Sequence, residues 1–274
     1  MPEPSLAVVI VSYNVRADLG RCLGSIVGHT EPFPTTFVVV DNGSIDGTLE
    51  MLQRDWPAVQ ALDAGGNVGF SRGNNLGIRA TTSDFVLLLN PDTEVPDGQV
   101  PALMRALLAD AEAAAAGPRL VDAAGWPELS FGPMVSPWGE FTQRRLTRAY
   151  DARQPWAVAR VERMTREPGV RDWVSGACLL ARRADLDAVG LLDERYFMYT
   201  EDVDLCAAFR AGGRTVRFVP EVTVRHLRGR SAATAPAATE MRRRQSQLAF
   251  YRKHHPAWAP ILAFWLKRRG RDVR

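Results

Sequence analysis

The chain has 274 residues, of which 46% are hydrophobic and 24% are charged. This length and composition are typical of a globular protein with a sizeable core, and they argue against a disordered chain, a collagen or a coiled coil. The cysteines are widely spaced and include no C-x-x-C pair: Cys22, Cys178 and Cys206. They favour reduced thiols over a disulfide framework or a thiolate zinc site, and hence a cytoplasmic protein.

The net charge of +3 conceals an uneven distribution. From Arg225 onward there are 13 Lys and Arg against two acidic residues, a net +11, whereas the preceding 224 residues carry 21 against 29, a net −8. No secretory signal is visible at the N-terminus. The longest apolar run, Ala257–Leu266, has ten residues, about half of the roughly 20 needed to span a bilayer. We therefore expect different partners for the body and the basic tail.

The first half of the sequence alternates β-rich runs with helical patterns. Strands are expected at Leu6–Val11, Phe37–Val40 and Phe85–Leu89, each apolar enough to be buried on both faces. Apolar residues recur with helical spacing from Leu19 to Val27 and from Val100 to Leu108. Strands joined through helices predict an α/β fold with a mostly parallel, Rossmann-like sheet flanked by helices. Ligands of such sheets bind beyond the carboxyl ends of the strands.

The second half is less regular. The stretch Trp126–Asp172 has weak periodicity and is expected to be an irregular excursion over the surface. Beyond it, the patterns predict a strand at Trp173–Ala181, a helix at Val203–Ala211 with Cys206 and Phe209 inward, strands at Thr215–Val219 and Val222–His226, and a basic helix at Glu240–His254.

Polar side chains follow the first two strands. Ser12-Tyr13-Asn14 comes after the first, and residues 41–48 (DNGSIDGT) come after the second. A strand-end aspartate can accept hydrogen bonds from a nucleobase imide or a ribose hydroxyl, and for Asp41 we favour this ligand role over helix capping. For Asp46 we favour the cap of the helix that starts near Thr48.

Residues 65–77 (GGNVGFSRGNNLG) place five glycines at the opening of a helix. Such a segment allows close approach of the backbone to a phosphate, with helix N–H groups pointing at it. Packing of the helix on the sheet explains the glycines nearly as well. The pattern is neither G-x-G-x-x-G nor a Walker loop.

Acidic residues follow the third strand and also open a later helix. Residues 90–94 (NPDTE) resemble a D-x-D arrangement for a divalent cation, with Asn90 in place of the first acid; alone, they would read as a common turn. Residues 193–205 contain five acids and three aromatic residues. A carboxylate there could act as a general base toward a hydroxyl, whereas the helix dipole accounts for some of these acids but not all.

In order and content, seven segments resemble glycosyltransferase family 2, the inverting GT-A enzymes, and especially its bacterial rhamnosyltransferase-like branch. They are VVIVSYN (8–14), VVVDNGSIDGT (38–48), GGNVGFSRGNNLG (65–77), LLLNPDTE (87–94), VSGACLLARR (174–183), DERYFMYTEDVDLCAAFRAGG (193–213) and VRHLRGRS (224–231). Their collinear order over about residues 6–231 implies a GT-A fold and glycosyltransferase activity.

The resemblance implies a donor pocket. Asp41 resembles the family aspartate that holds the nucleobase, with Ser12 and Tyr13 lining the same pocket. Asn67 and Arg72 fall in the glycine-rich segment near the donor.

The resemblance to this family also implies which residues bind the metal and which residue acts as the general base. Asp92 matches the last acid of the D-x-D motif that holds Mg²⁺ or Mn²⁺, and Asn90 departs from its first acid. His226 resembles a late histidine that approaches the metal or the diphosphate, with a structural role as the alternative. Asp202 falls where the family has its general base, and Glu201 is the competing candidate.

The implied reaction is the inverting transfer of a hexose from a nucleotide sugar to a saccharide or lipid-linked acceptor in cell-surface polysaccharide synthesis. Rhamnose from a dTDP-sugar is the expected hexose. The alternatives are a UDP-sugar donor, for example a galactofuranosyl donor, or a nucleotide-sugar-binding module without turnover. The expected enzyme domain covers 1–231, with a nucleotide-sugar-binding half at 1–122 and an acceptor-binding half at 123–231. A basic amphipathic segment, 232–274, follows.

Three basic clusters, at 242–244, 252–255 and 267–269, flank the apolar run of the tail. Basic residues around a short aromatic-rich segment are typical of a helix that lies on an anionic membrane. They predict peripheral contact with the inner face of the plasma membrane, where a lipid-linked acceptor would be found. A packing helix with a solvated basic face is the alternative. Nucleic-acid binding is not expected, because the chain lacks a recognition fold.

Overall fold

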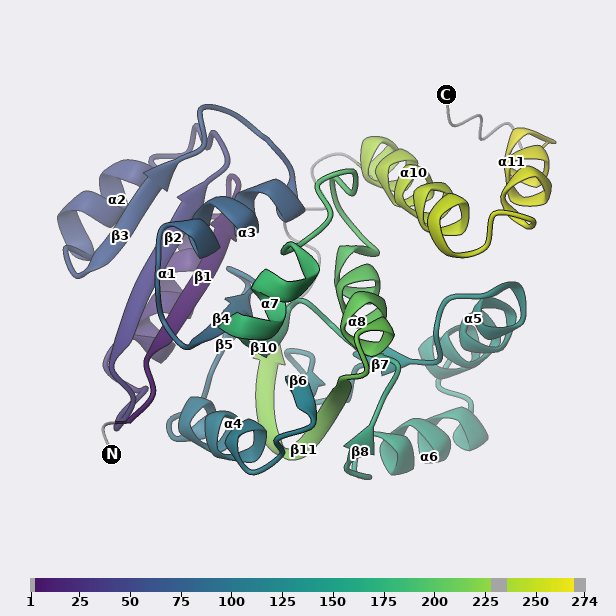
Figure 1. Cartoon of the computed structure of the whole chain (residues 1–274), viewed down its shortest axis with the longest axis horizontal. Coiled ribbons are helices and arrows are strands. Elements are labelled where there is room, and N and C mark those ends of the chain that lie inside the picture. The colour runs from purple at the N-terminus through teal and green to yellow at the C-terminus, as the bar shows by residue number, and fades with distance from the viewer. Residues whose placement is uncertain (1–2, 228–235, 269–274) are drawn as a thin grey trace.

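The computed structural model describes residues 3–227 and 236–268. Its centre is a nine-stranded sheet with the order β3-β2-β1-β4-β10-β6-β11-β5, and β8 pairs with β11 outside this path (Figure 1). A separate pair consists of β7 and β9. The strands are β1 (Leu6–Ser12), β2 (Thr35–Asp41), β3 (Val59–Asp63), β4 (Phe85–Leu89), β5 (Thr93–Glu94), β6 (Ala113–Val121), β7 (Phe131–Gly132), β8 (Gly169–Val170), β9 (Trp173–Val174), β10 (Cys178–Arg182) and β11 (Thr215–His226).

The sheet is mixed but mostly parallel. The strands β3, β2, β1 and β4 run parallel to one another, and β6 and β11 form a second parallel pair. Between these groups lies β10, which is antiparallel to both β4 and β6. The predicted α/β fold and the first three predicted strands are confirmed.

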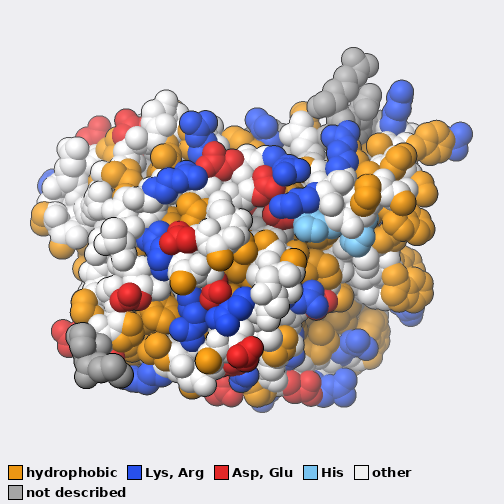
Figure 2. Space-filling model, viewed as in Figure 1, with side chains coloured by type: hydrophobic (Ala, Val, Ile, Leu, Met, Phe, Trp, Pro, Cys, Tyr) orange, Lys and Arg blue, Asp and Glu red, His pale blue; other side chains and the backbone are white. Residues whose placement is uncertain are grey.

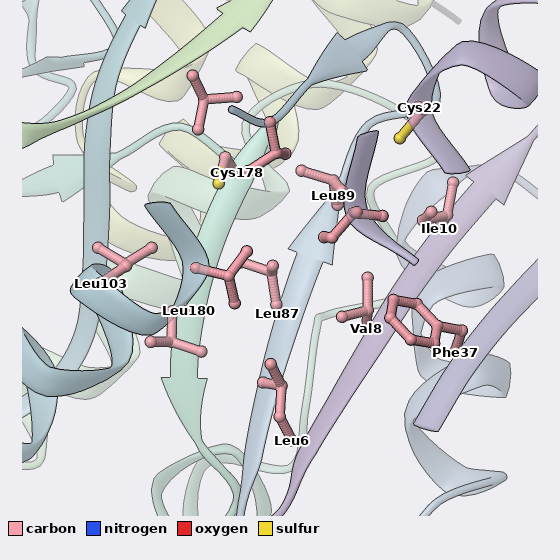
Figure 3. Close-up of a cluster of buried hydrophobic side chains, with 14 of the residues drawn as sticks. Leu6, Val8, Ile10, Cys22, Phe37, Leu87, Leu89, Leu103, Cys178 and Leu180 are labelled. Atoms are coloured by element: carbon pink, nitrogen blue, oxygen red, sulfur yellow. The ribbon is translucent and has the colours of Figure 1, made fainter. Parts of the chain in front are cut away.

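Helices cover both faces of this sheet. One face carries α1 (Arg16–Ile26), α2 (Thr48–Asp55) and α4 (Gln99–Leu108), and the other carries α3 (Phe70–Arg79), α7 (Arg183–Val189) and α8 (Glu201–Ala211). Both faces of β1 are buried, because alternate residues point in opposite directions: Val8 joins the first core and Val9 the second. Figure 3 shows the first core, where Cys22 and Leu103 contribute side chains from the helices.

The prediction of an irregular excursion over Trp126–Asp172 is wrong. This stretch contains α5 (Pro137–Asp151) and α6 (Pro155–Met164), which pack together through a cluster that includes Leu146 and Val161. Only three side chains of α5 and two of α6 are buried. Such narrow apolar stripes leave little periodicity for sequence patterns to detect.

Two strand predictions also need correction. The single strand expected at Trp173–Ala181 is divided into β9 and β10, with the chain between them lying at the end of the sheet. Conversely, the two strands expected near the end of the body form one strand, β11, whose register shifts between Val219 and Thr223. Such a bulge bends a strand without ending it. The patterns also miss β6, which begins with four alanines, because alanine is a weak strand former.

The aspartate predicted to cap the helix near Thr48, Asp46, contacts the first residues of two helices. Its Oδ1 accepts a hydrogen bond from the hydroxyl of Thr48 (2.5 Å), the first residue of α2. Its carboxylate accepts a hydrogen bond from the backbone N–H of Arg16 (2.8 Å), the first residue of α1. The N-cap of α2 is Gly47, which has no side-chain cap.

The chain ends in α10 (Pro236–His254) and α11 (Ala259–Arg268), which lie with α5 and α6 at the end of the molecule opposite the N-terminus (Figure 1). The predicted basic helix is confirmed, and its residues Leu248, Phe250 and Tyr251 are buried against Tyr196 and Val203 of the body. None of the helices in residues 3–227 and 236–268 is both long and apolar enough to cross a membrane. The predicted boundary between residues 231 and 232 lies outside the described residues.

Candidate active site

Two polar residues end adjacent parallel strands at the carboxyl edge of the sheet. Ser12 of β1 and Asp41 of β2 are partners in register, and their exposed fractions are 0% and 1%. Asp41 Oδ2 accepts a hydrogen bond from the backbone N–H of Ser44 (3.0 Å). Within the described part of the chain, Asp41 Oδ1 and Ser12 Oγ have no hydrogen-bond partner. An unsatisfied buried polar atom costs about 1–3 kcal/mol, so this pair is suited to a ligand that supplies the missing partners.

The glycine-rich segment lies over these strand ends. The side-chain amide of Asn42 donates to the carbonyl of Gly69 (3.1 Å), and a Cβ on Gly43 would lie 2.8 Å from the Cα of Gly66. Further along, Gly73 and Gly77 allow α3 to pack directly on valines of β1. The packing interpretation therefore accounts for the glycines within α3, whereas those before the helix bring backbone to the edge of the site.

The remaining predicted donor residues are on the surface of the same edge. Tyr13 follows Ser12 and is 39% exposed. Asn67 and Arg72 are both exposed, and Asn67 Oδ1 accepts a hydrogen bond from the backbone N–H of Gly69 (3.2 Å), which shapes the turn into α3. No contact among the described residues assigns either side chain to the donor, so their roles stay predictions.

Asn90, Asp92 and His226 meet beyond the end of β4. His226 Nε2 lies 3.3 Å from Asp92 Oδ1 and 3.4 Å from Asn90 Nδ2, and Asp92 is 7% exposed. The pairing of β5 with the last residues of β11 brings the histidine to this edge. Residues that are 134 positions apart in the sequence, Asp92 and His226, thus form one cluster.

Glu128 completes this cluster and was not among the predicted residues. Its Oε2 lies 3.1 Å from His226 Nδ1, and its side chain is 5% exposed. Burial lowers the pKa of His226, but hydrogen bonds to Asp92 and Glu128 outweigh it and raise the pKa to about 9. The local sequence WPELSF carries no signal for this role; only the return of the chain after β6, with the Glu128 N–H bonded to the Leu120 carbonyl, brings it here.

The donor set of this cluster fits a hard or borderline divalent cation. Asp92 offers a carboxylate oxygen, and His226 would offer an imidazole nitrogen once the cation displaces the proton on Nε2. Glu128 on the opposite ring nitrogen would orient that imidazole. Among the described residues, no three His, Cys, Asp or Glu side chains form a group able to hold a metal by themselves. Mg²⁺ and Mn²⁺ sites commonly use one or two protein ligands and complete their coordination with substrate phosphate and water. The residues therefore fit a cation that binds together with its substrate.

Asp202 lies in the first turn of α8, and two backbone N–H groups hold its carboxylate. Oδ2 accepts from Gly176 (2.9 Å) and Oδ1 from Val203 (2.8 Å). The preceding residues, Tyr199 and Thr200, have φ angles of +70° and +73°, a left-handed conformation that is unfavourable for side chains of this size. Burial raises the pKa of Asp202, although the N–H donors oppose that rise.

The two residues that precede β10 connect Asp202 with the Asp92 cluster. The carbonyl of Ala177 accepts from the backbone N–H of Asn90 (2.9 Å), and the preceding residue, Gly176, donates to Asp202. Asp92 and Asp202 therefore lie at the same edge of the sheet, as a shared site requires.

Glu201 is the more enclosed of the two candidate bases. It is 6% exposed, and no described residue makes a hydrogen bond to its Oε2. Burial, reinforced by the charge of Asp202, raises the pKa of Glu201 well above its usual range. Asp202 is half-buried by comparison, so its carboxylate is the better placed to meet a substrate.

Known proteins resemble this chain in sequence. Residues 2–259 match the model of the glycosyltransferase-like family 2. The chain is 34% identical over 280 residues to N-acetylglucosaminyl-diphospho-decaprenol L-rhamnosyltransferase of Mycobacterium tuberculosis, covering 93% of this chain and 87% of the relative. It is 28% identical to the low-salt glycan biosynthesis hexosyltransferase Agl10 of Haloferax volcanii, covering 73% of this chain and 60% of the relative.

Solved structures show the same fold. The mannosyltransferase PcManGT of Pyrobaculum calidifontis, in complex with GDP-Man and Mn²⁺, superposes with a TM-score of 0.62 at 18% identity, covering 95% of this chain and 68% of the neighbour. GalNAc-T7, with UDP, GalNAc and Mn²⁺, superposes with a TM-score of 0.61 at 16% identity, covering 82% of this chain and 44% of the neighbour. The GT-A fold prediction is confirmed. The chain belongs to glycosyltransferase family 2 and is an inverting glycosyltransferase that uses a nucleotide sugar.

Proposed function

We propose that this glycosyltransferase transfers rhamnose from a dTDP-sugar to a lipid-linked saccharide in the synthesis of a cell-surface polysaccharide. The observation that carries the proposal is the similarity over 93% of the chain to a mycobacterial enzyme named for L-rhamnosyl transfer to a diphospho-decaprenol acceptor. The strand-end site supports it, because its groups match the parts of such a reaction.

The donor would bind across the ends of β1 and β2. The unpartnered Asp41 Oδ1 and Ser12 Oγ suit the imide N–H and carbonyl of a pyrimidine base, with Tyr13 beside them. Asn67, in the loop before α3, and Arg72, in the first turn of α3, would then face the diphosphate and the sugar, where the Arg72 guanidinium supplies positive charge.

Asp92 and His226 would hold Mg²⁺ or Mn²⁺ together with the donor diphosphate, and Asn90 would contact the same phosphates. When bound, the cation stabilises negative charge on the leaving nucleoside diphosphate. Glu128 holds the His226 ring in place from its other nitrogen.

Asp202 would act as the general base. Its carboxylate takes the proton from an acceptor hydroxyl while the hydroxyl oxygen attacks the anomeric carbon, and the bond from that carbon to the diphosphate breaks on the opposite face. A single displacement inverts the anomeric centre. Two backbone N–H groups keep the carboxylate aimed, and its raised pKa makes it a stronger base than an exposed aspartate.

The test measures transfer and donor binding with purified protein, a panel of dTDP- and UDP-sugars, and Mn²⁺. We expect dTDP-rhamnose to be the preferred donor. Asp202→Asn should lower kcat by about 10²–10⁴-fold with little change in donor affinity, whereas the matched variant Glu201→Gln should retain most activity.

Other outcomes would revise the proposal in defined ways. A preference for a UDP-sugar would mean that the donor is a UDP-sugar and not dTDP-rhamnose. Selective loss of activity in Glu201→Gln would mean that Glu201, and not Asp202, is the general base. Donor binding without transfer to any acceptor would favour the binding module without turnover.

A lipid-linked acceptor also implies where the enzyme acts. We place it in the cytoplasm, in peripheral contact with the inner face of the plasma membrane through its C-terminal segment. The supporting observation is the pairing of exposed apolar and basic residues on α11.

A further inference from the structure

The helix α11 is apolar on two faces. Its inner face, Ala259, Leu262, Ala263 and Leu266, is buried or half-buried, and most of it joins the cluster formed with α10. Its outer face carries Ile261, Phe264 and Trp265, which are 57%, 61% and 36% exposed. A helix at a protein surface normally presents polar residues on its outer face. This outer face therefore suggests contact with something other than water.

A second apolar stripe occurs on α5. Trp138 and Phe141 are 75% and 58% exposed, and their rings stack with centroids 5.9 Å apart. One and two turns further along the helix, the exposed stripe continues with Arg145 and Arg148. An exposed face that passes from aromatic to basic residues is typical of a helix at a membrane interface.

The helix α10 and the α10–α11 turn connect α5 with α11. The α10–α11 turn is attached to the residues before α5, since His255 Nε2 lies 2.7 Å from the Val135 carbonyl oxygen. Within α10, Gln247 donates to Glu140 of α5 (2.6 Å). The exposed residue Trp258, in the same turn, extends the apolar surface. Figure 2 shows hydrophobic side chains gathered along the right-hand edge, from α11 down toward α5.

The charge of this region selects among the partners that could cover it. Residues 236–268 contain seven Lys and Arg and one acid, Glu240, which is paired with Arg243 and Arg244. Beside the apolar surface, Arg252, Lys267 and Arg268 are exposed. Basic side chains around aromatic ones match a bilayer of anionic lipid, whose headgroups attract the cations and whose interface accepts the rings.

We infer that the outer faces of α5 and α11, with Trp258 between them, form one surface that binds an anionic membrane. The inference deepens the proposed function, because it rests on a lipid-linked acceptor and names the lipid surface that presents it. The sequence prediction confined membrane contact to the tail. In the structure, α10 packs into the body instead, and α5 supplies two of the six exposed apolar residues of the surface, Trp138 and Phe141.

Two contacts with a buried aspartate link this surface to the proposed base. Lys253 and His254 of α10 contact Asp204 at 2.7 and 2.6 Å, and Asp204 is 2% exposed. Asp204 lies on α8, two residues after Asp202. A membrane that binds α11 would therefore set the height of Asp202 above the bilayer, where the sugar of a lipid-linked acceptor must reach it.

The test uses full-length protein and vesicles, either phosphatidylcholine alone or phosphatidylcholine with phosphatidylglycerol. The double variant Phe141→Ser/Phe264→Ser is compared with the control Leu108→Ser/Val170→Ser, which also replaces two exposed apolar residues, 39% and 52% exposed, on α4 and β8. Wild type and control should bind the anionic vesicles, with binding reduced in high salt. The surface variant should bind at least about tenfold more weakly.

Activity separates this inference from the proposed function. The surface variant should keep wild-type transfer to a water-soluble, short-chain acceptor and lose transfer to the same saccharide on a vesicle-borne lipid. Equal vesicle binding by surface variant and control would overturn the inference. So would a dimer in sedimentation velocity that the surface variant abolishes, with no vesicle binding by the wild type. Absence of transfer to any acceptor, with vesicle binding intact, would count against the proposed function alone.

Discussion

The strand-end site and the surface of α5 and α11 carry opposite kinds of unfavourable group. At the strand ends, polar atoms such as Asp41 Oδ1 are buried without a partner among the described residues. On the helices, large apolar side chains such as Phe264 are exposed to water. Each arrangement lowers the stability of the ligand-free chain, and each would be offset by a ligand of matching chemistry. The comparison supports the two proposals made above, because buried polar atoms without a partner suit a nucleotide and exposed apolar side chains suit a bilayer.

Substitutions on the two sides of the C-terminal helices should differ most in their effect on the stability of the protein. Phe250→Ala removes a ring that is fully buried between α10 and the body, so we expect a loss of about 3–5 kcal/mol in the free energy of unfolding. Phe264→Ala, on the exposed face of α11, should change it by about 0.5 kcal/mol or less. Urea unfolding of both variants measures the contrast. Similar losses would mean that something covers Phe264 in the isolated protein.

Removal of the proposed cation ligand is the next largest effect. Asp92→Asn should lower kcat by about 100-fold or more and abolish the stimulation of activity by Mn²⁺, since the amide is a weaker ligand than a carboxylate. The neighbouring variant Glu94→Gln is the control, because Glu94 pairs with Arg225 at the surface instead. Metal titrations of transfer activity distinguish them. An equal response of the two variants to Mn²⁺ would show that Asp92 is not a ligand of the cation.

Asp41 should affect donor binding rather than folding. Asp41→Asn places amide hydrogens where a base imide would donate, and we expect donor affinity to fall by about 1–3 kcal/mol, or roughly 10- to 100-fold. The stability of the donor-free protein should stay level or rise, because a neutral amide is buried in place of a charged carboxylate. Asp63→Asn, the register partner on the exposed side of β3, is the control. Calorimetric titration with the nucleoside diphosphate measures both, and unchanged affinity in Asp41→Asn would contradict the pocket.

The smallest expected effect concerns the buried Glu201. Burial raises its pKa well above the unfolded value, so the ionised carboxylate opposes folding at a pH above that raised pKa. Glu201→Gln should therefore stabilise the protein by about 0.5–2 kcal/mol near neutral pH. As the pH falls through the raised pKa toward the unfolded value, Glu201 becomes protonated and the advantage of the variant should shrink. Thermal unfolding from pH 8 to pH 5 follows this difference; a constant gap would mean that Glu201 does not titrate in this range.

The strand-end residues were predictable because local patterns encode them. Long runs of Val, Leu and Ile mark β1, β2 and β4, and polar residues follow each run directly, as at Asp41 and Asp92. In a parallel sheet these residues must emerge at one edge, so their approximate position follows without knowledge of the tertiary structure.

Glu128 and the link from Asp204 to α10 were not predictable in the same way. Glu128 is one acid in an irregular stretch and reaches His226 across 98 residues. Lys253 and His254 appear in the sequence as part of a basic tail, yet both are used to pair with a buried aspartate. Nothing in the neighbouring residues distinguishes these charges from solvated ones.

By itself, the sequence determined the fold class, three strands of the first half (β1, β2 and β4), and the kinds of group that follow them. Tertiary structure alone decided that β10 inserts between β4 and β6, which brings Asp202 to the edge that holds Asp92, and that α10 is core while α11 is surface. The physical reason is the separation in sequence over which each kind of interaction acts. Strand and helix propensities depend on residues a few positions apart, whereas the pairing of distant strands and helices depends on which buried surfaces fit together.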